Sequence, residues 1–529
     1  MERMSGSFPG GWVMSMTRAS VAMLAGLAVA GSTLMAPGVI ASPVEGRAVN
    51  WGTNPARDSS TKRFWRVPVA VDTSGVLAGK TVTGIAGGSR FSCAVADGQV
   101  YCWGRNWGGQ LGDGSKTGRR VPVAVDASGV LAGKTVTAIA AGDSHSCVVA
   151  DGQVYCWGGN WGGQLGDGST TERLVPVAVD TSGVLAGKTV TGISAGGSHT
   201  CAVADGRAYC WGKKLYGQWG SDLTGPLGND STTSSSVPVA VDTSGVLAGK
   251  TVTSIATGHF HTCAVADGQA YCWGGNYFGQ LGDGTTTSAL VPVSVDASAV
   301  LAGRTVTSIA TGHFHTCAVA DGRAYCWGDR DYGQLGTNRP TGSIGDRDIS
   351  RVPVAVGSGV LAGKTVTAVT AAGGFSCAVA DGQAYCWGRN DSGQLGNNST
   401  KKSRVPVAVS TAGLLHHTSV VAMASSLHTH TLAIVVPMTS VPQPPTAPRG
   451  IKVVVKKRKV KITWKPLNAA TSYRVRISKP DGTKFEKWKT NNTRVFKTKV
   501  RKGEKYRFQV AAVGVGGRGP TATKRFKAR

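Results

Sequence analysis

The amino-acid sequence predicts an all-β protein in which a seven-bladed β-propeller is followed by a smaller β-sandwich. Three observations lead to this prediction: a repeat with steps of 54 to 62 residues, a Trp-Gly pair that recurs seven times in register, and a change of composition near Val436. A fixed period of this length is typical of propellers, solenoids and other arrays. The 75 glycines suit a loop-rich chain with many tight turns.

Each repeat contains four short runs that we expect to form β-strands. In the copy that starts at Val67 these runs are PVAV, TVTGIA, SCAVA and QVYCW. Four strands per repeat are the content of one propeller blade. The Trp-Gly pairs therefore predict seven blades, and they begin at Trp51, Trp103, Trp157, Trp211, Trp273, Trp327 and Trp387.

Six near-identical hairpins hold all twelve cysteines. In the first, CAVADGQVYCWG, the Asp97-Gly98 pair between two alternating runs predicts a two-residue turn. This register places Cys93 opposite Cys102 at a non-hydrogen-bonded position, where Cα atoms are about 4.5 Å apart and a disulfide can form. The alternative is a set of buried free thiols. The six predicted disulfides are Cys93–Cys102, Cys147–Cys156, Cys201–Cys210, Cys263–Cys272, Cys317–Cys326 and Cys377–Cys386.

The two ends of the repeat region predict that the ring closes. RAVNWGTN (47–54) matches QVYCWGRN (99–106), which we interpret as the last strand of a blade, and HTLAIVV (430–436) matches the strand before it. A seventh blade built from both ends removes open sheet edges. Asn50 stands where a Cys is expected, and Thr431 or Leu432 stands at its partner position, so both cysteines of this pair are missing together.

The segment GDSHSCVVADGQVYCWGGNWGGQLGDGS (142–169) resembles the repeat of the regulator-of-chromosome-condensation (RCC1) family, a seven-bladed propeller. The resemblance covers residues 47–436, and its motifs are G-x-x-H-[ST] and W-G-x-N-x-x-G-Q-L-G. Phe91 and Phe375 replace the repeat His in two blades, and the paired cysteines are not general in eukaryotic members. We interpret the repeat His as a buried residue that bonds to backbone rather than as a metal ligand, because only one lies in each blade. These residues are His145, His199, His261 and His315.

The N-terminus predicts export. Arg18 precedes the apolar stretch SVAMLAGLAVAGSTLM (20–35), and Val39 and Ala41 suit a signal-peptidase site. We expect residues 1–41 to be a signal peptide and the protein to be secreted or held at the cell surface; the alternative is a retained membrane anchor. Disulfides persist in such oxidising compartments. The nucleotide exchange that the family resemblance implies needs a reduced intracellular setting, so we expect no small GTPase as partner.

A second domain follows a Pro-rich linker at 437–448. In residues 449–529, the runs VKITW, SYRVRIS and YRFQVAAVG alternate apolar and polar residues as half-buried strands do. Trp464, Tyr473 and Tyr506 in these runs resemble those of a fibronectin type III domain, which implies that Trp464 lies on the second strand and Tyr506 at a tyrosine corner.

The positive charge is concentrated in this second domain. The chain carries a net charge of +28; residues 445–529 contribute +23, with 26 Lys and Arg against three acidic residues, and the rest of the chain contributes +5. Such a charge attracts polyanions over long distances. The expected partners are an anionic cell-wall polymer, a membrane surface or a polysaccharide; the alternative is a solubilising face without a ligand. Sequence-specific nucleic-acid binding is not expected, because no reading motif is present.

The sequence contains no recognisable catalytic constellation, cofactor motif or metal-site spacing. The loop after W-G-x-N instead varies between blades and carries aromatic residues. Because equivalent loops of a propeller open on one rim, we expect these side chains to form an arc there that binds a partner; the alternative is that they pack the blade tops. The candidate residues are Trp107, Trp161, Tyr216, Tyr277, Phe278 and Tyr332.

The sequence thus predicts a secreted, non-enzymatic binding protein whose propeller rim contacts a protein partner and whose basic domain attaches to an anionic surface. A secreted bacterial β-lactamase-inhibitor protein shares the propeller and binds through an aromatic-rich loop face, but no residue here identifies that target. The alternatives are a carbohydrate-binding accessory module, a β-lactamase-inhibitor-like protein and a catalytic propeller with clustered carboxylates or His in its channel.

Overall fold

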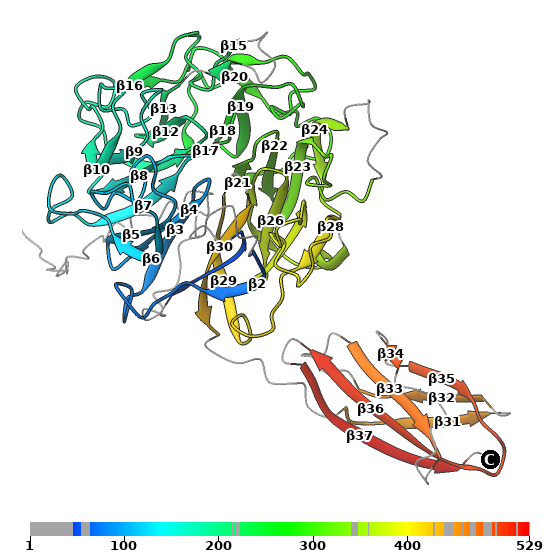
Figure 1. Cartoon of the computed structure of the whole chain (residues 1–529). Helices are drawn as coiled ribbons and strands as arrows, with labels where there is room; N and C mark the ends of the chain where they lie inside the picture. The colour runs from blue at the N-terminus through cyan, green and yellow to red at the C-terminus, as the bar shows by residue number, and fades with distance from the viewer. Residues whose placement is uncertain are drawn as a thin grey trace, which may run out of the picture. The chain divides into compact units, whose positions relative to one another are not determined.

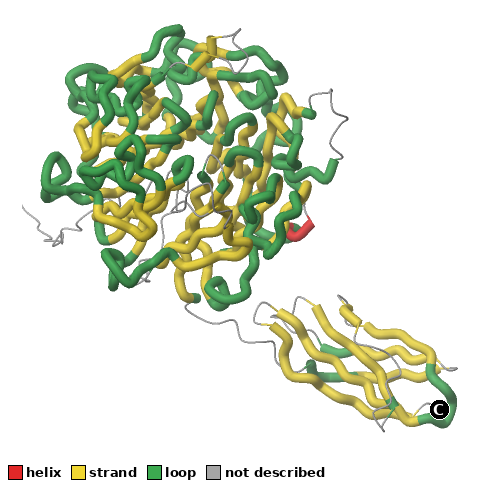
Figure 2. The backbone as a smooth tube through the Cα atoms, in the orientation of Figure 1, coloured by secondary structure: helices red, strands yellow, loops and turns green. Residues whose placement is uncertain are grey.

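The structure is a computed structural model, and it describes residues 46–53, 64–213, 215–216, 223–339, 348–357, 359–426, 429–438, 448–456, 459–465, 472–479, 489–491, 495–514 and 517–527. Contacts within the chain divide it into two compact units, Met1–Pro437 and Met438–Arg529. Both units consist of strands and loops (Figure 1, Figure 2), apart from the short 3-10 turn η1 (Gly359–Leu361). The predicted signal peptide, 1–41, and most of the predicted linker, 437–448, lie outside the described residues.

The first unit contains seven four-stranded antiparallel sheets, which are the seven predicted blades of a β-propeller (Figure 1). The innermost strand of each blade contacts the innermost strands of both neighbouring blades. In the order of blades 1 to 7, these inner strands are β3 (Val82–Gly87), β7 (Val136–Ala141), β11 (Val190–Ala195), β17 (Val252–Thr257), β21 (Val306–Thr311), β25 (Val366–Ala371) and β29 (Thr418–Ser425). The second strands are β4 (Phe91–Ala96), β8 (His145–Ala150), β12 (His199–Ala204), β18 (His261–Ala266), β22 (His315–Ala320), β26 (Phe375–Ala380) and β30 (His430–Pro437).

The two outer strands of each blade differ in burial, since the third strand is buried and the fourth is mostly half-buried or exposed. The third strands are β5 (Gln99–Gly104), β9 (Gln153–Gly158), β13 (Arg207–Gly212), β19 (Gln269–Gly274), β23 (Arg323–Asp329), β27 (Gln383–Gly388) and β1 (Arg47–Thr53). The fourth strands are β6 (Arg119–Ala124), β10 (Arg173–Ala178), β16 (Ser235–Ala240), β20 (Ala289–Ser294), β24 (Ile349–Ala355), β28 (Ser403–Ala408) and β2 (Phe64–Ala70). A two-stranded ribbon, β14 (Leu215–Tyr216) and β15 (Leu223–Thr224), extends the third blade.

Blade 7 closes the ring with strands from both ends of the repeat region. β1 pairs with β30 on one side and with β2 on the other, and Asn50 lies opposite Leu432. Trp51 is fully buried, and its indole N–H donates to the Gln394 carbonyl oxygen at 2.8 Å, across 343 residues of sequence. The predicted closure is confirmed, and the position that lacks a cysteine faces leucine.

The sheets correct the predicted strand order within a blade. The Val-Pro-Val strand follows the Trp-Gly strand of the preceding blade and forms its outer edge, so β6 pairs with β5. QVYCWG is therefore the third strand and not the last one. The physical reason is that Pro lacks a backbone donor and is tolerated on an edge strand, where one side needs no ladder partner.

The cysteine hairpins have the predicted register. Cys93 lies opposite Cys102 with the Cα atoms 4.1 Å apart, and the turn residues Asp97 and Gly98 both have positive φ, 49° and 73°. Positive φ at both positions is required by a type I′ turn, which suits the twist of the two strands. In the structure all six pairs are disulfides, with Cα–Cα distances of 4.0 to 4.1 Å.

The hydrophobic core of the propeller lies between neighbouring blades. One cluster, for example, joins Phe91 and Val100 of blade 1 to Ile139 and Trp157 of blade 2. The indole N–H of the fully buried Trp157 donates to the carbonyl oxygen of Gln110 in the loop of blade 1, at 2.9 Å. Each Trp-Gly strand thus packs its Trp against the previous blade, which explains why this dipeptide recurs with the blade period.

The second unit is a β-sandwich of a three-stranded and a four-stranded sheet. Trp464 follows the second strand and packs against Tyr473 and Phe508, with ring centroids 5.3 and 5.9 Å apart. The Tyr506 hydroxyl accepts a hydrogen bond from the Arg501 backbone N–H at 3.0 Å, as in a tyrosine corner. The sheets contain β31 (Lys452–Lys456), β32 (Lys459–Thr463) and β35 (Val495–Lys499), and β34 (Lys489–Asn491), β33 (Ser472–Ser478), β36 (Lys505–Gly514) and β37 (Gly517–Lys527).

Candidate binding surface

Two sets of loops open on the same face of the propeller. In blade 1, residues 88–90 join the first two strands and residues 105–118 follow the third strand. These loops lie side by side, because Phe91 pairs with Gly104 and the Arg105 N–H donates to the Arg90 carbonyl at 2.9 Å. We call this the loop face. The Asp-Gly turns lie at the other end of the same strands and form the opposite face.

The outer loop is held in one conformation by the Asn of W-G-x-N. In blade 1, Asn106 is fully buried; its amide nitrogen donates to the Ser115 carbonyl at 2.9 Å, and its amide oxygen accepts from the Leu111 N–H at 2.9 Å. The same arrangement recurs around Asn160, Asn276 and Asn390. A loop fixed in this way presents its tip with little further loss of conformational entropy on binding.

The candidate aromatic residues occupy two adjacent positions of this loop. Trp107, Trp161 and Tyr277 take the first position, whereas Phe278 and Tyr332 take the second. The side chains of Trp107, Trp161 and Tyr332 are 71%, 58% and 39% exposed, and those of Tyr277 and Phe278 are half-buried. Tyr216 lies in β14, and its side chain is outside the described part of the chain.

The second position packs against the inner loop of the next blade. Phe278 lies 4.5 Å from Phe314 between ring centroids, and Phe314 stacks on Phe260 at 5.2 Å. His259 and His313 extend this group, with their own rings 4.9 Å apart and His259 4.3 Å from Phe260. These five half-buried residues form what we call the Phe/His cluster, on blades 4 and 5.

Four members of the Phe/His cluster are not among the residues predicted from the sequence: His259, Phe260, His313 and Phe314. The signal was present in two GHFHT segments, 258–262 and 312–316, in which His-Phe precedes the repeat His; blades 2 and 3 have Asp-Ser and Gly-Ser there. The additional His-Phe pair is easily overlooked, because the last His of each segment is the repeat His and the segment therefore fits the repeat. An inner-loop position that changes from Ser to Phe in only two blades is a feature of those blades and not of the fold.

Charged groups border the aromatic residues. His259 Nε2 lies 3.1 Å from the Asp143 carboxylate, which reaches across blade 3 because Gly197 carries no side chain at the equivalent position. The Arg105 guanidinium lies 3.1 Å from the centroid of the Trp107 ring, a cation–π contact. Arg389 lies over Tyr332 at 5.3 Å and also pairs with Asp391. The loop face therefore combines apolar rings with both signs of charge.

Blade 5 departs from the Asn pattern and places a carboxyl group in its outer loop instead. Asp329 accepts hydrogen bonds from the Gln334 amide at 2.8 Å and from the Asp331 N–H at 3.1 Å. Burial raises the pKa of Asp329 to about 7. Arg330 takes the Asn position and pairs with Asp348. The described residues contain no group of three His, Cys, Asp or Glu side chains placed to hold a metal ion.

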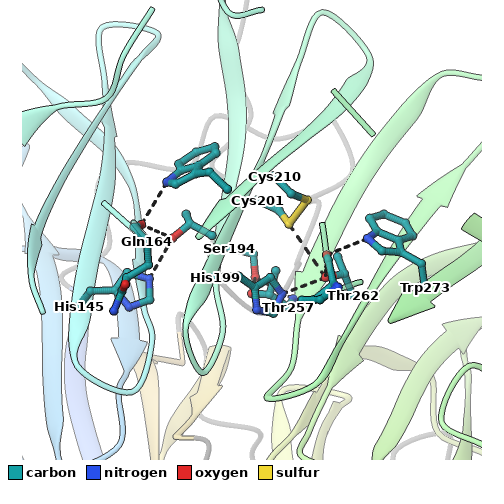
Figure 3. The surroundings of a disulfide bond; sticks show 12 residues. His145, Gln164, Ser194, His199, Cys201, Cys210, Thr257, Thr262 and Trp273 are labelled. Carbon is teal, nitrogen blue, oxygen red and sulfur yellow. Dashed lines mark hydrogen bonds between the residues drawn. A yellow bond between two sulfur atoms is a disulfide. The ribbon is translucent and has the colours of Figure 1, made fainter. Parts of the chain in front are cut away.

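The repeat His residues lie beneath the loop face and connect the blades. His199 Nε2 lies 2.9 Å from the Thr262 hydroxyl of the next blade (Figure 3). That hydroxyl donates to the Pro226 carbonyl at 2.9 Å. The partner is thus a side chain, so the predicted bond to backbone is wrong. Equivalent pairs are His145–Thr200, His261–Thr316, His315–Ser376 and His430–Ser92.

The inner strands surround a narrow cavity of about 60 Å³ at the centre of the ring. Small residues line it, with at least one from every blade. Two pairs of hydroxyls bridge neighbouring blades there, Ser194 with Thr257 at 2.8 Å and Thr370 with Ser425 at 2.7 Å. One water molecule needs about 10 to 15 Å³ of such volume, so the cavity has room for a few water molecules.

Comparison with known proteins agrees with this architecture. The family model of the RCC1-like domain matches residues 48–433, and that of the fibronectin type III domain matches residues 446–527. In sequence, the chain is 29% identical to human E3 ubiquitin-protein ligase HERC2 over 366 residues, 68% of this chain and 7% of HERC2. It is 33% identical to the ultraviolet-B receptor UVR8 of Arabidopsis thaliana over 305 residues, 56% of this chain and 62% of UVR8.

Solved structures share the propeller fold. Prp20p from Saccharomyces cerevisiae has a TM-score of 0.62 at 21% identity, with 75% of this chain and 93% of that chain covered. Human WBSCR16 has a TM-score of 0.61 at 21% identity, with 74% and 99% covered. No described helix is long and apolar enough to cross a membrane. On these matches and on its seven four-stranded blades, the chain belongs to the RCC1-like propeller family and carries a fibronectin type III domain after the propeller.

Proposed function

We propose that the protein is a secreted, non-enzymatic binding protein whose loop face captures a protein partner. The observation that carries this proposal is the exposure of Trp107 and Trp161, 71% and 58%, on loops that buried Asn residues hold rigid. Large aromatic side chains on a preorganised surface are typical anchors of protein interfaces. The neighbouring Phe/His cluster adds apolar area on blades 4 and 5.

Proteins of this fold support a protein as the ligand class. Prp20p of Saccharomyces cerevisiae binds Gsp1p and histones, and yeast RCC1 has been solved bound to Kap60. Those partners belong to those proteins. The six disulfides are compatible with an extracellular location, where such bonds persist. For this reason we expect an extracellular partner and not a small GTPase.

The second domain adds attraction to polyanionic surfaces. Its 26 basic residues outnumber its acidic residues by 23, a field that steers it toward anionic polymers, membranes or polysaccharides. This attraction depends on salt, because exposed charges are screened beyond about 8 Å at physiological ionic strength. Binding through the loop face rests on buried apolar contact and depends on salt much less.

A capture experiment tests the loop face. The full chain is used as bait in the secreted fraction of its own cells at high salt, beside a variant with Trp107, Trp161 and Tyr277 changed to Ala. A lost anchor of this kind costs about 2 kcal/mol or more, so the partner should be lost from the variant. The matched control changes three exposed valines near the Asp-Gly turns to Ala: Val130, Val184 and Val246.

The outcomes separate the candidate surfaces. Retention of the partner by the aromatic variant, with loss in the valine control, would place the site on the opposite face. If no protein is captured and a glycan array binds the wild-type chain but not the aromatic variant, the carbohydrate-binding alternative replaces our proposal. Equal melting temperatures for the three proteins show that the propeller remains folded in each.

A further inference from the structure

Four exposed lysines face one another on the three-stranded sheet of the second unit. Lys459 and Lys461 lie on β32, and Lys497 and Lys499 lie on the neighbouring strand β35. In the register of these strands, Lys459 is opposite Lys499 and Lys461 is opposite Lys497. All four side chains point to the solvent face of the sheet. We call them the lysine ladder.

This arrangement is unfavourable for the isolated domain. Directly opposite side chains of an antiparallel pair have Cβ atoms about 4.5 to 5.5 Å apart, and like charges at that distance repel. Within the described part of the chain, none of the four ammonium groups has an ion pair or a hydrogen bond. The described acidic residue of this unit, Glu504, is paired with Lys479 at 3.5 Å instead. Among the described residues of this unit, nothing therefore compensates the repulsion in the ladder.

A hollow of about 580 Å³ lies along the ladder. Val454, which is 49% exposed, and Thr498 contribute to its lining together with the four lysines. Lysine stems cover apolar surface while their ammonium groups remain in water. The two rows of lysines lie side by side on paired strands, and Val454 on β31, opposite Lys461, adds apolar surface beside them.

We propose that the lysine ladder is a binding site for a linear phosphate polymer, whose chain lies in the hollow with its phosphates between the two rows of lysines. The inference rests on the proposed attachment of the second domain to anionic surfaces and names the ligand class. Residues two apart on a strand are about 6.8 Å apart and neighbouring strands about 4.8 Å, so the four charges form a strip that a chain of phosphates can follow. Lysine binds phosphate as a point charge, without demanding a fixed bidentate geometry.

The shape and composition of the hollow favour a chain over other polyanions. A planar membrane cannot enter a concave strip, whereas a polymer chain can. Proteins that bind single-stranded nucleic acid stack the bases on aromatic side chains, and the residues that line this hollow are lysine, valine and threonine. The described lining therefore offers positive charge to phosphates and no aromatic ring on which a base could stack.

The other sheet of the same domain provides a matched control. It also places like charges opposite one another, with Lys505 facing Lys527 and Arg507 facing Arg525. One of its cations has a polar partner, since Arg476 Nε donates to the Gln509 side chain at 2.8 Å. Four exposed cations on this sheet can be neutralised for the same loss of net charge: Arg474, Lys505, Arg525 and Lys527.

The test compares two variants of the full chain, each with four cations changed to Gln. The ladder variant carries Lys459→Gln, Lys461→Gln, Lys497→Gln and Lys499→Gln; the control carries the four changes on the other sheet. The probe is long-chain inorganic polyphosphate, titrated calorimetrically between about 50 and 200 mM NaCl. With a slope of about −0.7 per phosphate contact for a single strand, four contacts should weaken wild-type binding about 50-fold over this range.

We expect the ladder variant to lose most of this affinity and most of the salt slope, and the control to keep both to within a few fold. An equal loss in the two variants would mean that net charge alone binds the polymer; the ladder would then be refuted while the proposed attachment stands. If the wild-type chain binds neither polyphosphate nor vesicles of phosphatidylcholine and phosphatidylserine at the lowest salt concentration, the attachment itself is wrong. Binding to the vesicles but not to polyphosphate would refute the assigned ligand.

A stability measurement checks the ladder independently of any ligand. Removing like charges that face one another should leave the melting temperature of the second domain unchanged or raise it. A fall would mean that the lysines stabilise the fold through contacts of their own, which contradicts the uncompensated repulsion. In that case the pair Lys461→Gln and Lys497→Gln is the milder variant, and its polyphosphate affinity should fall by at least several fold.

Discussion

The contact between His199 and Thr262 gives a quantitative test of how the blades are joined. The Thr262 hydroxyl donates its hydrogen to the Pro226 carbonyl, so toward His199 it can only accept. The proton of the neutral imidazole must therefore be on Nε2. His199 Nδ1 is buried and has no hydrogen-bond partner. Thr262→Val consequently leaves a buried N–H unsatisfied in either tautomer.

The expected cost of Thr262→Val follows from this geometry. An unsatisfied buried donor costs about 1 to 3 kcal/mol. The Pro226 carbonyl does not add to this cost, because the Trp273 indole N–H still donates to it at 2.9 Å. Thr262→Ser is the control: it keeps the hydroxyl and removes one methyl group, for about 0.8 kcal/mol. Serine occupies the same position in three other blades, as Ser92, Ser146 and Ser376.

A double-mutant cycle isolates the pair. His199→Phe removes the N–H and introduces the residue that blades 1 and 6 carry, Phe91 and Phe375. In that background Thr262→Val should cost less by about 1 to 2 kcal/mol, within the range for residues in contact. The free energy of unfolding of the propeller is measured in urea at neutral pH on the full chain. Additive single effects, or equal costs for Val and Ser at position 262, would refute the relay from His through hydroxyl to carbonyl.

Two further predictions concern the propeller as a whole. Burial lowers the pKa of His145 to about 4 and of His199, His261 and His315 to about 3, so below about pH 6.5 the unfolded chain binds protons that the folded chain does not. As the pH is lowered from about 6 to 4.5, the free energy of unfolding should fall by about 1.4 kcal/mol per pH unit for each of these His residues. His199→Phe should reduce the pH dependence of this free energy, measured by urea unfolding, by that amount. An unchanged pH dependence would contradict the prediction. Deleting residues 42–54 removes β1, exposes the edges of β30 and β2 and should lower the melting temperature and cause aggregation, whereas an unchanged melting temperature would refute closure through this strand.

The sequence by itself determined the number of blades, the cysteine pairs and the closure of the ring, but not the strand order within a blade. The hairpin register, the cysteine pairs and the closing strands could be read from it because each depends on local rules: a two-residue turn sets which residues face each other, and a repeat multiplies the same evidence. The same locality explains the error in strand order. The sequence does not show at which strand a repeat begins. The Val-Pro-Val strand pairs with the Trp-Gly strand that precedes it, and only the hydrogen bonds of the sheet show this pairing.

Only the tertiary structure decided the contacts between blades and the composition of the loop face. His199 and Thr262 are 63 residues apart in the sequence, and neither residue type predicts a contact with the other. Asp143 meets His259 because a glycine in the intervening blade leaves room, and Phe278 joins Phe260 through Phe314 of the next blade. The lysine ladder likewise depends on which strands neighbour one another in the sandwich. Long-range pairing of this kind is set by packing of the whole unit, and periodicity within one strand carries no information about it.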